Sequence, residues 1–336
     1  IKTKIISINM VKIKKIIIWG HKLHSHTHSY IHNAFYIAFK YLSFETYWFD
    51  DNDDVSKFDF SNSLFITEHQ VDFKIPKRDN CLYFCHSIDP GKYDMLPQEN
   101  IIELLVSFRD MYGEHATNYK KQKNIDLKAI PLNEKNYEFY FKDEKHYKYF
   151  TMWGTDLLPH ELQNNIDNLE LISKKREPNN YYFIGSFTQS HANILPYLQQ
   201  HNIQFKKGGA TFNINSNQNM SIDMNAECMQ RSVVASAFQY GQQLQESYIP
   251  CRIFKNISYG RMGITNNKIV NDLFNNKLIY DPDPIKCLDL GVEFENRSDK
   301  LDIVKELMYK VKDEHTYISR IESMKYFINN FTKFSI

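Results

Sequence analysis

The chain has few of the residues that mark specialised classes of protein. Its 5 cysteines include no closely repeated pairs, so neither a disulfide framework nor a zinc ribbon is indicated, and we expect a reducing compartment. The most apolar early stretch, residues 5–19, is broken by lysines and is too short for a membrane span or signal-peptide core. A net charge of +1 does not favour nucleic acid or an anionic membrane surface. We therefore expect a cytoplasmic protein without an integral membrane segment or a nucleic-acid partner.

Aromatic residues, in contrast, are abundant. Phe, Tyr and Trp make up 15% of the chain and apolar residues 42%, a composition that argues against disorder. A length of 336 residues suits two domains better than one core. The chain begins with Ile1 and its first methionine is Met10, so we leave the opening residues out of the fold expectations.

Short apolar runs alternate with helical patterns through most of the chain. Such an alternation predicts an α/β fold with parallel strands in a sheet covered on both faces. The pattern breaks around residues 151–156, and the polar stretch 174–180 indicates a linker. The expected strands cover residues 15–19, 45–49, 63–67, 81–85, 101–108, 181–184, 203–205 and 278–280, and the expected helices cover 29–42, 192–200 and much of 299–332.

Residues 248–267 predict a helix that ends at a glycine and leads into a short strand. Pro250 suits the first turn of a helix, because its φ angle is already helical and its missing N–H would have no partner there. Gly260 can adopt the left-handed conformation that ends a helix, and residues 264–265 start the next strand.

Two cations lie near the start of this helix. Arg252 and Lys255 are three residues apart and share one face, with Asn256 beside them. Cations at the positive end of a helix dipole are unfavourable unless an anion lies between them and the free backbone donors. This placement predicts an anionic ligand, the alternative being an ordinary amphipathic helix with both cations in water.

The segment 231–267 resembles the donor-binding core of glycosyltransferases with the GT-B architecture. Residues 252–258, Arg-Ile-Phe-Lys-Asn-Ile-Ser, are similar to an Arg-Ile-Phe-Glu-Ala-Leu-Ala-type helix, and residues 260–265, Gly-Arg-Met-Gly-Ile-Thr, to a Gly-x-Pro-x-Ile-type strand. Looser similarity covers Trp-Gly-His at 19–21 and Thr-Met-Trp-Gly-Thr-Asp at 151–156. One departure is that Lys255 replaces the glutamate that holds the donor ribose in many such enzymes.

The resemblance implies two Rossmann-like domains that face each other across a cleft, with a C-terminal helix that crosses back to the first domain. We expect an acceptor-side domain over residues 1–156, joined by a helix at about 314–336, and a donor domain over residues 157–313. Ligands of open α/β sheets lie beyond the carboxyl ends of the strands, so the cleft is the expected site.

Residues 21–32 contain five of the 13 histidines. His24, His26 and His28 would share one side of an extended segment, whereas His28 and His32 would share one face of the following helix. We favour an active-site loop, because the turn after the first strand faces the cleft and neutral imidazole can abstract a proton near pH 7. The alternatives are a metal site, for which no cysteine or nearby acid completes the ligand set, and satisfied or solvated histidines.

Three other polar segments carry weaker signals. The acidic turn at residues 50–54 resembles an Asp-x-Asp manganese site, but its position after the second strand suits a solvated turn better, and the first turn lacks the Gly-x-Gly-x-x-Gly of dinucleotide sites. Gly185, Ser186 and Thr188 follow the first strand of the second domain, where their donors could reach a phosphate. Glu246 ends a glutamine-rich stretch and could replace the missing ribose carboxylate.

Together with the resemblance, these patterns predict a metal-independent glycosyltransferase that moves a sugar from a nucleotide-sugar to a glycan or other hydroxyl acceptor and needs no cofactor. The alternatives are a nucleotide-sugar epimerase of the same fold, a non-catalytic nucleotide- or glycan-binding protein, and a metal-dependent hydrolase built on the histidine loop. His26 or His28 is the expected base, and Arg252 offsets charge on the leaving group. The expected donor-binding residues are Gly185, Ser186, Thr188, Glu246, Tyr248, Pro250, Arg252, Lys255 and Asn256, and the expected acceptor-side residues are Gly20, His21 and His24.

Overall fold

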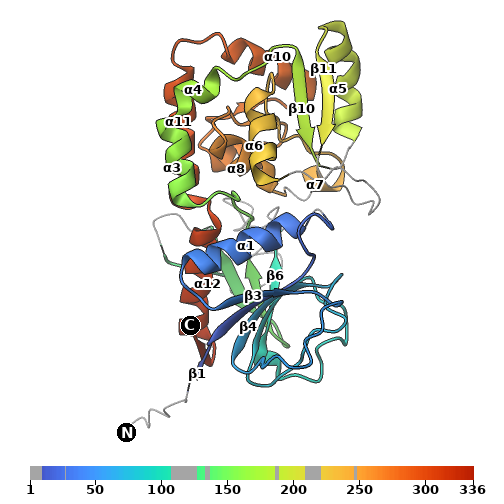
Figure 1. Ribbon diagram of the computed structural model, residues 1–336, viewed down its shortest axis with the longest axis vertical. Coiled ribbons are helices and arrows are strands. Elements are labelled where there is room, and N and C mark those ends of the chain that lie inside the picture. The colour runs from blue at the N-terminus through green and yellow to red at the C-terminus, as the bar shows by residue number, and fades with distance from the viewer. Residues whose placement is uncertain are drawn as a thin grey trace.

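The computed structural model describes residues 10–26, 28–106, 127–132, 137–185, 189–208, 221–245 and 248–336. The described elements form an elongated α/β molecule with two halves (Figure 1). A large sheet occupies one half, and most of the helices surround smaller sheets in the other half. None of the helices in this described part combines the length and apolarity that a membrane span needs.

The large sheet has eight strands in the described residues, in the order β3-β2-β4-β5-β6-β9-β8-β7. Its pairs from β3 to β9 are parallel, whereas β8 pairs antiparallel with both β9 and β7. The predicted strands at its centre are confirmed, but the antiparallel edge was not expected. The strands are β2 (Lys15–Trp19), β3 (Thr46–Phe49), β4 (Ser63–Glu68), β5 (Leu82–His86), β6 (Ile101–Leu105), β7 (Lys128–Ala129), β8 (Phe139–Lys142) and β9 (Tyr147–Phe150).

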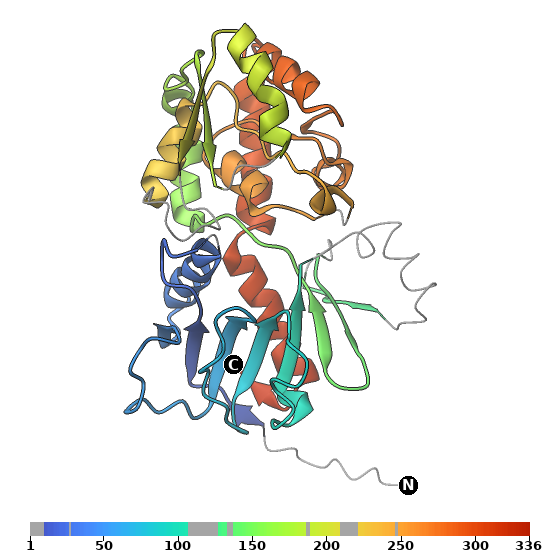
Figure 2. The same ribbon diagram turned by 90° about the vertical axis from the view of Figure 1, so that its right-hand side faces the viewer.

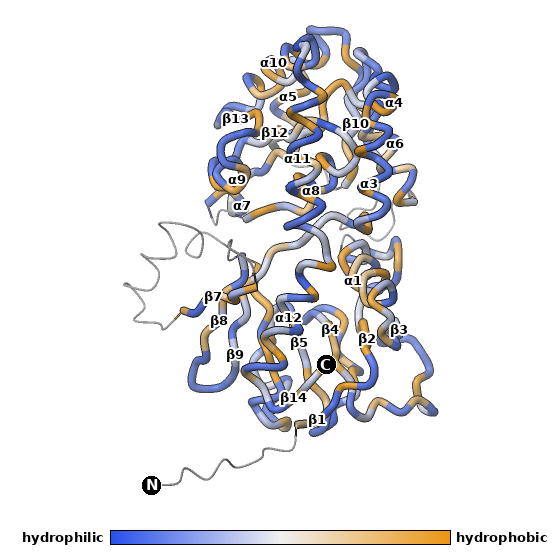
Figure 3. The backbone as a smooth tube through the Cα atoms, turned by 90° about the vertical axis from the view of Figure 1, so that its left-hand side faces the viewer, coloured by the Kyte–Doolittle hydropathy of each residue, from blue (hydrophilic) through white to orange (hydrophobic). Residues whose placement is uncertain are grey.

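Helices α1 (Ser29–Tyr41) and α12 (Tyr317–Phe331) cover one face of this sheet (Figure 2). Phe35 of α1 and Phe327 of α12 pack in one core with Ile16 and Ile18, which lie in the hydrophobic stretch of β2 in Figure 3. The sheet is covered on both faces, as expected, but the second face has no α-helix from this part of the chain, because the only helical segment between β3 and β6 is a single 3-10 turn, Gln98–Asn100. Loops rich in aromatic residues cover the second face instead, and their rings pack on Trp19 and Tyr83.

The order of the strands creates a switch point between β2 and β4, near the β3 edge of the sheet. The chain runs from β2 through α1 to β3 on one side, and then crosses to β4 on the other side of β2. Ligands of open α/β sheets bind at the carboxyl ends of the strands beside such a switch point. In this chain those ends carry His21 after β2, Glu68 at the end of β4 and His86 at the end of β5.

The other half contains two parallel strand pairs, β10 with β11 and β12 with β13. Residues 232–238 run between the pairs, because the Val233 N–H donates to Asn180 O at 2.7 Å and Ser236 forms a parallel bridge to Ile264. The strands are β10 (Asn180–Ile184), β11 (Gln204–Gly208), β12 (Ile264–Thr265) and β13 (Ile279–Tyr280). The helices are α3 (Pro159–Asp167), α4 (Leu169–Ser173), α5 (Gln189–Gln200), α6 (Ile222–Arg231), α7 (Gln242–Gln245), α8 (Cys251–Ser258), α9 (Lys268–Leu273), α10 (Pro284–Phe294) and α11 (Lys300–Glu314).

The chain passes between the halves at two adjacent places. The Thr155 N–H donates to His315 O at 2.9 Å, and Thr155 and Thr316 form a parallel bridge. Beyond Thr316, helix α12 returns to the large sheet, where the chain ends with β14 (Phe334–Ser335) paired to β1 (Val11–Lys12). Helices α3 and α4 already pack against α11, so the polar stretch 174–180 lies within the second half and does not link the halves.

Candidate functional site

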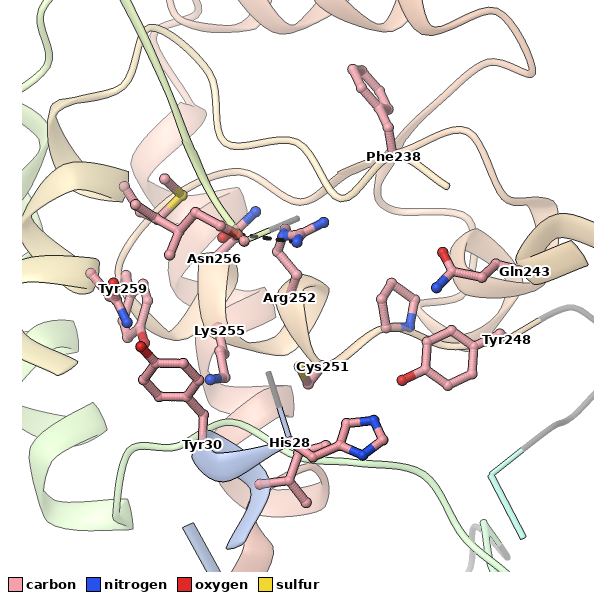
Figure 4. Close-up of a pocket in the computed structure, with 16 residues that line it drawn as sticks. His28, Tyr30, Phe238, Gln243, Tyr248, Cys251, Arg252, Lys255, Asn256 and Tyr259 are labelled. Atoms are coloured by element: carbon pink, nitrogen blue, oxygen red, sulfur yellow. Dashed lines mark hydrogen bonds between the residues drawn. The ribbon is translucent and has the colours of Figure 1, made fainter. Parts of the chain in front are cut away.

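A cavity of about 260 Å³ lies between the two halves of the molecule. His28 and Tyr30 lie on one side of it, and Arg252 and Lys255 of α8 lie on the other (Figure 4). It is therefore built from the start of α1 in one half and from the start of α8 in the other. Among its remaining lining residues are Ile31, Ile184, Gly185, Asn225, Phe238, Gln243, Tyr248, Pro250, Cys251, Asn256 and Tyr259.

Helix α8 forms as its sequence predicts, with one difference at its start. Pro250 precedes the first turn, with φ −73° and ψ 138°, and the helix itself begins at Cys251. Tyr259 ends the helix, and Gly260 has a φ of +86°, the left-handed conformation expected there. The first backbone N–H groups of a helix have no partner within it. In α8 the Ile253 N–H donates to Pro250 O at 3.2 Å, and we expect the N–H groups of Cys251 and Arg252, which line the cavity, to be available to a ligand.

Arg252 is the cation most open to a ligand. Its Nη2 donates to Ile184 O at 3.1 Å, and its guanidinium lies 4.5 Å from the Phe183 ring centroid. Within the described residues it forms no ion pair with a carboxylate, and burial lowers its pKa. A largely desolvated cation without a carboxylate partner favours an anionic ligand.

Gly185 lies next to the guanidinium of Arg252. Its φ is +124°, and a Cβ atom there would lie 2.9 Å from Arg252 Nη2. Glycine is therefore favoured at this position by backbone conformation, and a larger side chain would displace the guanidinium of Arg252. Its neighbours Ser186 and Thr188, and also Glu246, lie outside the described residues.

Lys255 has a partner that the sequence did not suggest. Its Nζ lies 2.9 Å from Oδ2 of Asp156, whose side chain is 1% exposed. Burial lowers the pKa of Lys255, but the charge of Asp156, the hydrogen bond to it and the nearby Cys251 and Tyr30 together outweigh burial, and the net direction is upward. The positive charge of Lys255 is thus largely compensated within the protein, which leaves Arg252 as the main attraction for an anion.

Asn256 is hydrogen-bonded to the loop beside α8. Its Nδ2 donates to Ala235 O at 2.9 Å and to Ser236 O at 3.2 Å, so only its amide oxygen is left for a ligand. Gln239 and Asn267 brace the next part of the wall, because the Nε2 of Gln239 and the Nδ2 of Asn267 donate to Tyr248 O at 2.7 and 3.2 Å. Buried amides of this kind hold the loop in place, and Tyr248 itself lines the cavity.

The histidine loop is folded back on itself, so the expected extended conformation is wrong. His24 has a φ of +72°, and its Nδ1 lies 3.3 Å from Tyr30 Oη. Tyr30 lines the cavity, but His24 does not. The ring of His26 stacks on that of His21 with centroids 4.2 Å apart. Gly20 also lies outside the lining, and its role is to make room, because a Cβ there would be 2.4 Å from the ring of His32.

Glu68 is the residue that the sequence reasoning missed. It ends β4 with 1% of its side chain exposed, and its carboxylate is surrounded by His21, His28 and His86. Burial raises the pKa of Glu68, but its contacts with these histidines together outweigh burial and hold the pKa well below its usual range. An acid at the carboxyl end of a buried parallel strand is the sequence signal that could have found it.

The structure separates the two candidate bases. His28 lines the cavity, and its Nδ1 hydrogen-bonds to Glu68 Oε2. His26 is 8% exposed and does not line the cavity, and burial together with His21 and His28 lowers its pKa to about 4. Only His28 can therefore face a substrate in the cavity.

The acidic turn after β3 has a structural role. The Oδ1 of Asp51 accepts hydrogen bonds from Trp19 Nε1 at 3.0 Å and from Lys74 N at 2.9 Å. Asp53 pairs with Lys22 at 2.8 Å. The turn thus ties loops of the sheet together, as a turn with local partners does.

Comparison with known protein families and with curated proteins found no match for this chain.

Proposed function

We propose that this chain is a glycosyltransferase that moves a sugar from a nucleotide-activated donor to a hydroxyl acceptor. The observation that carries the proposal is Arg252, a cation without a carboxylate partner in the described residues, beside the start of α8 and facing the cavity between the halves. The return of α12 to the large sheet is consistent with the GT-B architecture that we propose for the chain.

In this proposal the diphosphate of the donor binds at the start of α8. The free N–H groups of the first turn and the guanidinium of Arg252 would neutralise its charge. As the glycosidic bond breaks, negative charge grows on the leaving diphosphate, and a cation already in position stabilises it without reorganisation. Lys255, tied to Asp156, adds a weaker field from the same face of the helix.

On the opposite wall, His28 would remove the proton from the acceptor hydroxyl. Its Nδ1 is held by Glu68, which leaves Nε2 to accept that proton. A carboxylate in this position also stabilises the imidazolium that forms. A base across the cavity from the leaving group fits a reaction that inverts the anomeric centre.

The test is incubation of the purified chain with a panel of nucleotide sugars and hydroxyl acceptors. A thermal-shift screen against uridine, guanosine, cytidine and thymidine diphosphates first selects the base. Release of nucleoside diphosphate together with sugar transfer is the expected result. A new sugar isomer would instead indicate an epimerase, and binding without turnover a non-catalytic binding protein.

The variant that tests the site is Arg252→Ala. We expect it to weaken diphosphate binding at least about tenfold, which is about 1.4 kcal/mol. Arg297→Ala is the matched control, because Arg297 is half exposed and bonded to Asp299 rather than facing the cavity. Unchanged binding in Arg252→Ala would remove the anion site from α8 and with it the basis of the proposal.

A further inference from the structure

We propose that His21, His26 and Glu68 form a binding site for a divalent metal ion of the zinc class, directly behind His28. This site is separate from the proposed donor pocket and does not depend on glycosyl transfer. It lies at the carboxyl ends of β2 and β4, on the two sides of the switch point of the large sheet.

The three residues have the geometry of converging ligands. Each offers a nitrogen or oxygen atom, and these atoms all lie within 4.8 Å of one another. His21 Nε2 and Glu68 Oε1 are 3.0 Å apart. In a tetrahedral site with bonds of about 2.0–2.1 Å, neighbouring ligand atoms are roughly 3.3 Å apart, so the pair of His21 and Glu68 needs only a small adjustment to admit an ion.

Two of these atoms make a contact that is not a well-formed hydrogen bond. His21 Nε2 and Glu68 Oε1 are buried and lie 3.0 Å apart, yet the contact lacks hydrogen-bond geometry, and neither atom has another hydrogen-bond partner in the described part of the chain. Burying polar atoms without well-formed hydrogen bonds is unfavourable. A cation between them would satisfy both, and the buried carboxylate would compensate part of its charge.

His26 can supply the third ligand. Its ring stacks on that of His21, and its Nδ1 accepts a long bond, 3.2 Å, from the His28 N–H. A neutral imidazole has one lone pair, so coordination through Nδ1 would replace this bond. Two imidazoles and one carboxylate form a ligand set that zinc accepts, whereas magnesium and calcium prefer oxygen ligands.

A second group of possible ligands, His28, Glu68 and His86, is a weaker candidate. His28 Nδ1 is already hydrogen-bonded to Glu68 Oε2, so no space for an ion is left between these two atoms. The metal would therefore hold Glu68 by Oε1 and leave Oε2 to orient His28. In this arrangement the ion would fix the position of Glu68, which in turn orients His28.

The experiment uses the full chain, treated with a chelator and then titrated with ZnCl₂ by calorimetry and with CoCl₂ by visible absorption. We expect one equivalent of zinc and a cobalt spectrum typical of four-coordinate nitrogen and oxygen ligands. The variant His21→Asn should lower zinc affinity at least about a hundredfold, because one of three protein ligands is lost. Circular dichroism checks that each variant is folded.

The matched control is His24→Asn, which changes a histidine of the same loop that contacts Tyr30 instead of Glu68. Asn also tolerates the positive φ angle at this position. His24→Asn and His86→Ala should both keep the wild-type affinity. The proposal is overturned if the wild type binds no zinc, if His24→Asn loses as much affinity as His21→Asn, or if only His86→Ala loses it.

Discussion

Lys255 on the donor side of the cavity forms an ion pair with Asp156, in the segment that joins the two halves, with Nζ and Oδ2 2.9 Å apart. Asp156 also accepts hydrogen bonds from the Tyr259 hydroxyl at 2.8 and 3.0 Å. Next to it, the hydroxyls of Thr155 and Ser258 are 2.7 Å apart. Helix α8 is therefore attached directly to the crossing point of the chain, so the position of the anion site and the position of the halves are linked.

Removing Lys255 should destabilise the fold. In Lys255→Met the carboxylate of Asp156 stays buried without its cation, and breaking a buried pair in this way costs about 3–5 kcal/mol. The free energy of unfolding in urea measures the loss. Lys268→Met is the control, because Lys268 is 67% exposed and its pair with Asp272 should contribute at most about 1 kcal/mol. Equal losses of unfolding free energy in the two variants would mean that the Lys255 pair stabilises the fold no more than an exposed pair does.

Gly185→Ala should weaken anion binding more than it weakens the fold. The new methyl group would lie 2.9 Å from Arg252 Nη2 and would push the guanidinium out of place. A positive φ costs a non-glycine residue about 1–2 kcal/mol as well. Binding of a nucleoside diphosphate, measured by calorimetry, should fall at least about tenfold.

Gly241→Ala is the control for this substitution. Its φ of +57° is also positive, but a Cβ atom there meets nothing within 4 Å. It should therefore carry a smaller conformational cost, without the loss of binding. If both variants bind the diphosphate equally, displacement of Arg252 is not the cause.

The buried His191 should make stability depend on pH. Burial, together with the charge of Arg252, lowers the pKa of His191 to about 3, while its ordinary value is 6.5. Below pH 6.5 the unfolded chain takes up a proton that the folded chain does not, so stability is lost as the pH falls from about 6.5 towards 3. The loss approaches about 1.4 kcal/mol per pH unit within this window.

Urea unfolding at pH 7 and at pH 5 tests this contribution. His191→Gln should lose less stability between the two pH values than the wild type. His201→Gln, which changes an exposed histidine just beyond the same helix, should behave like the wild type. An unchanged pH dependence in His191→Gln would contradict the assignment.

The local parts of the fold could be predicted from the sequence, whereas its long-range contacts could not. The isoleucine-rich run before Trp19 and the start of α8 after Pro250 depend on neighbouring residues, and both formed where they were expected. Glu68 is 40 residues beyond His28, and its approach depends on the pairing of β2 with β4. The pair between Lys255 and Asp156 likewise depends on where the chain crosses between the halves, which no local pattern specifies.

His28→Ala should separate catalysis from binding. The imidazole faces the cavity but lies on the wall opposite Arg252, so its loss should leave the affinity for nucleoside diphosphate within about twofold. The turnover number of sugar transfer should fall about 10²–10⁴-fold, the usual contribution of a positioned base. The turnover number of Glu68→Gln should also fall, because a neutral amide orients the ring but no longer stabilises the imidazolium.

The matched variant for this experiment is again His24→Asn, whose side chain lies outside the cavity lining. It should keep both the wild-type turnover and the wild-type affinity. If His28→Ala retains full turnover, the acceptor is deprotonated by another group or the reaction needs no base, as in a transfer that retains the anomeric configuration. If His28→Ala loses diphosphate affinity as strongly as Arg252→Ala does, then His28 contacts the donor, and the assignment of opposite walls to donor and acceptor is wrong.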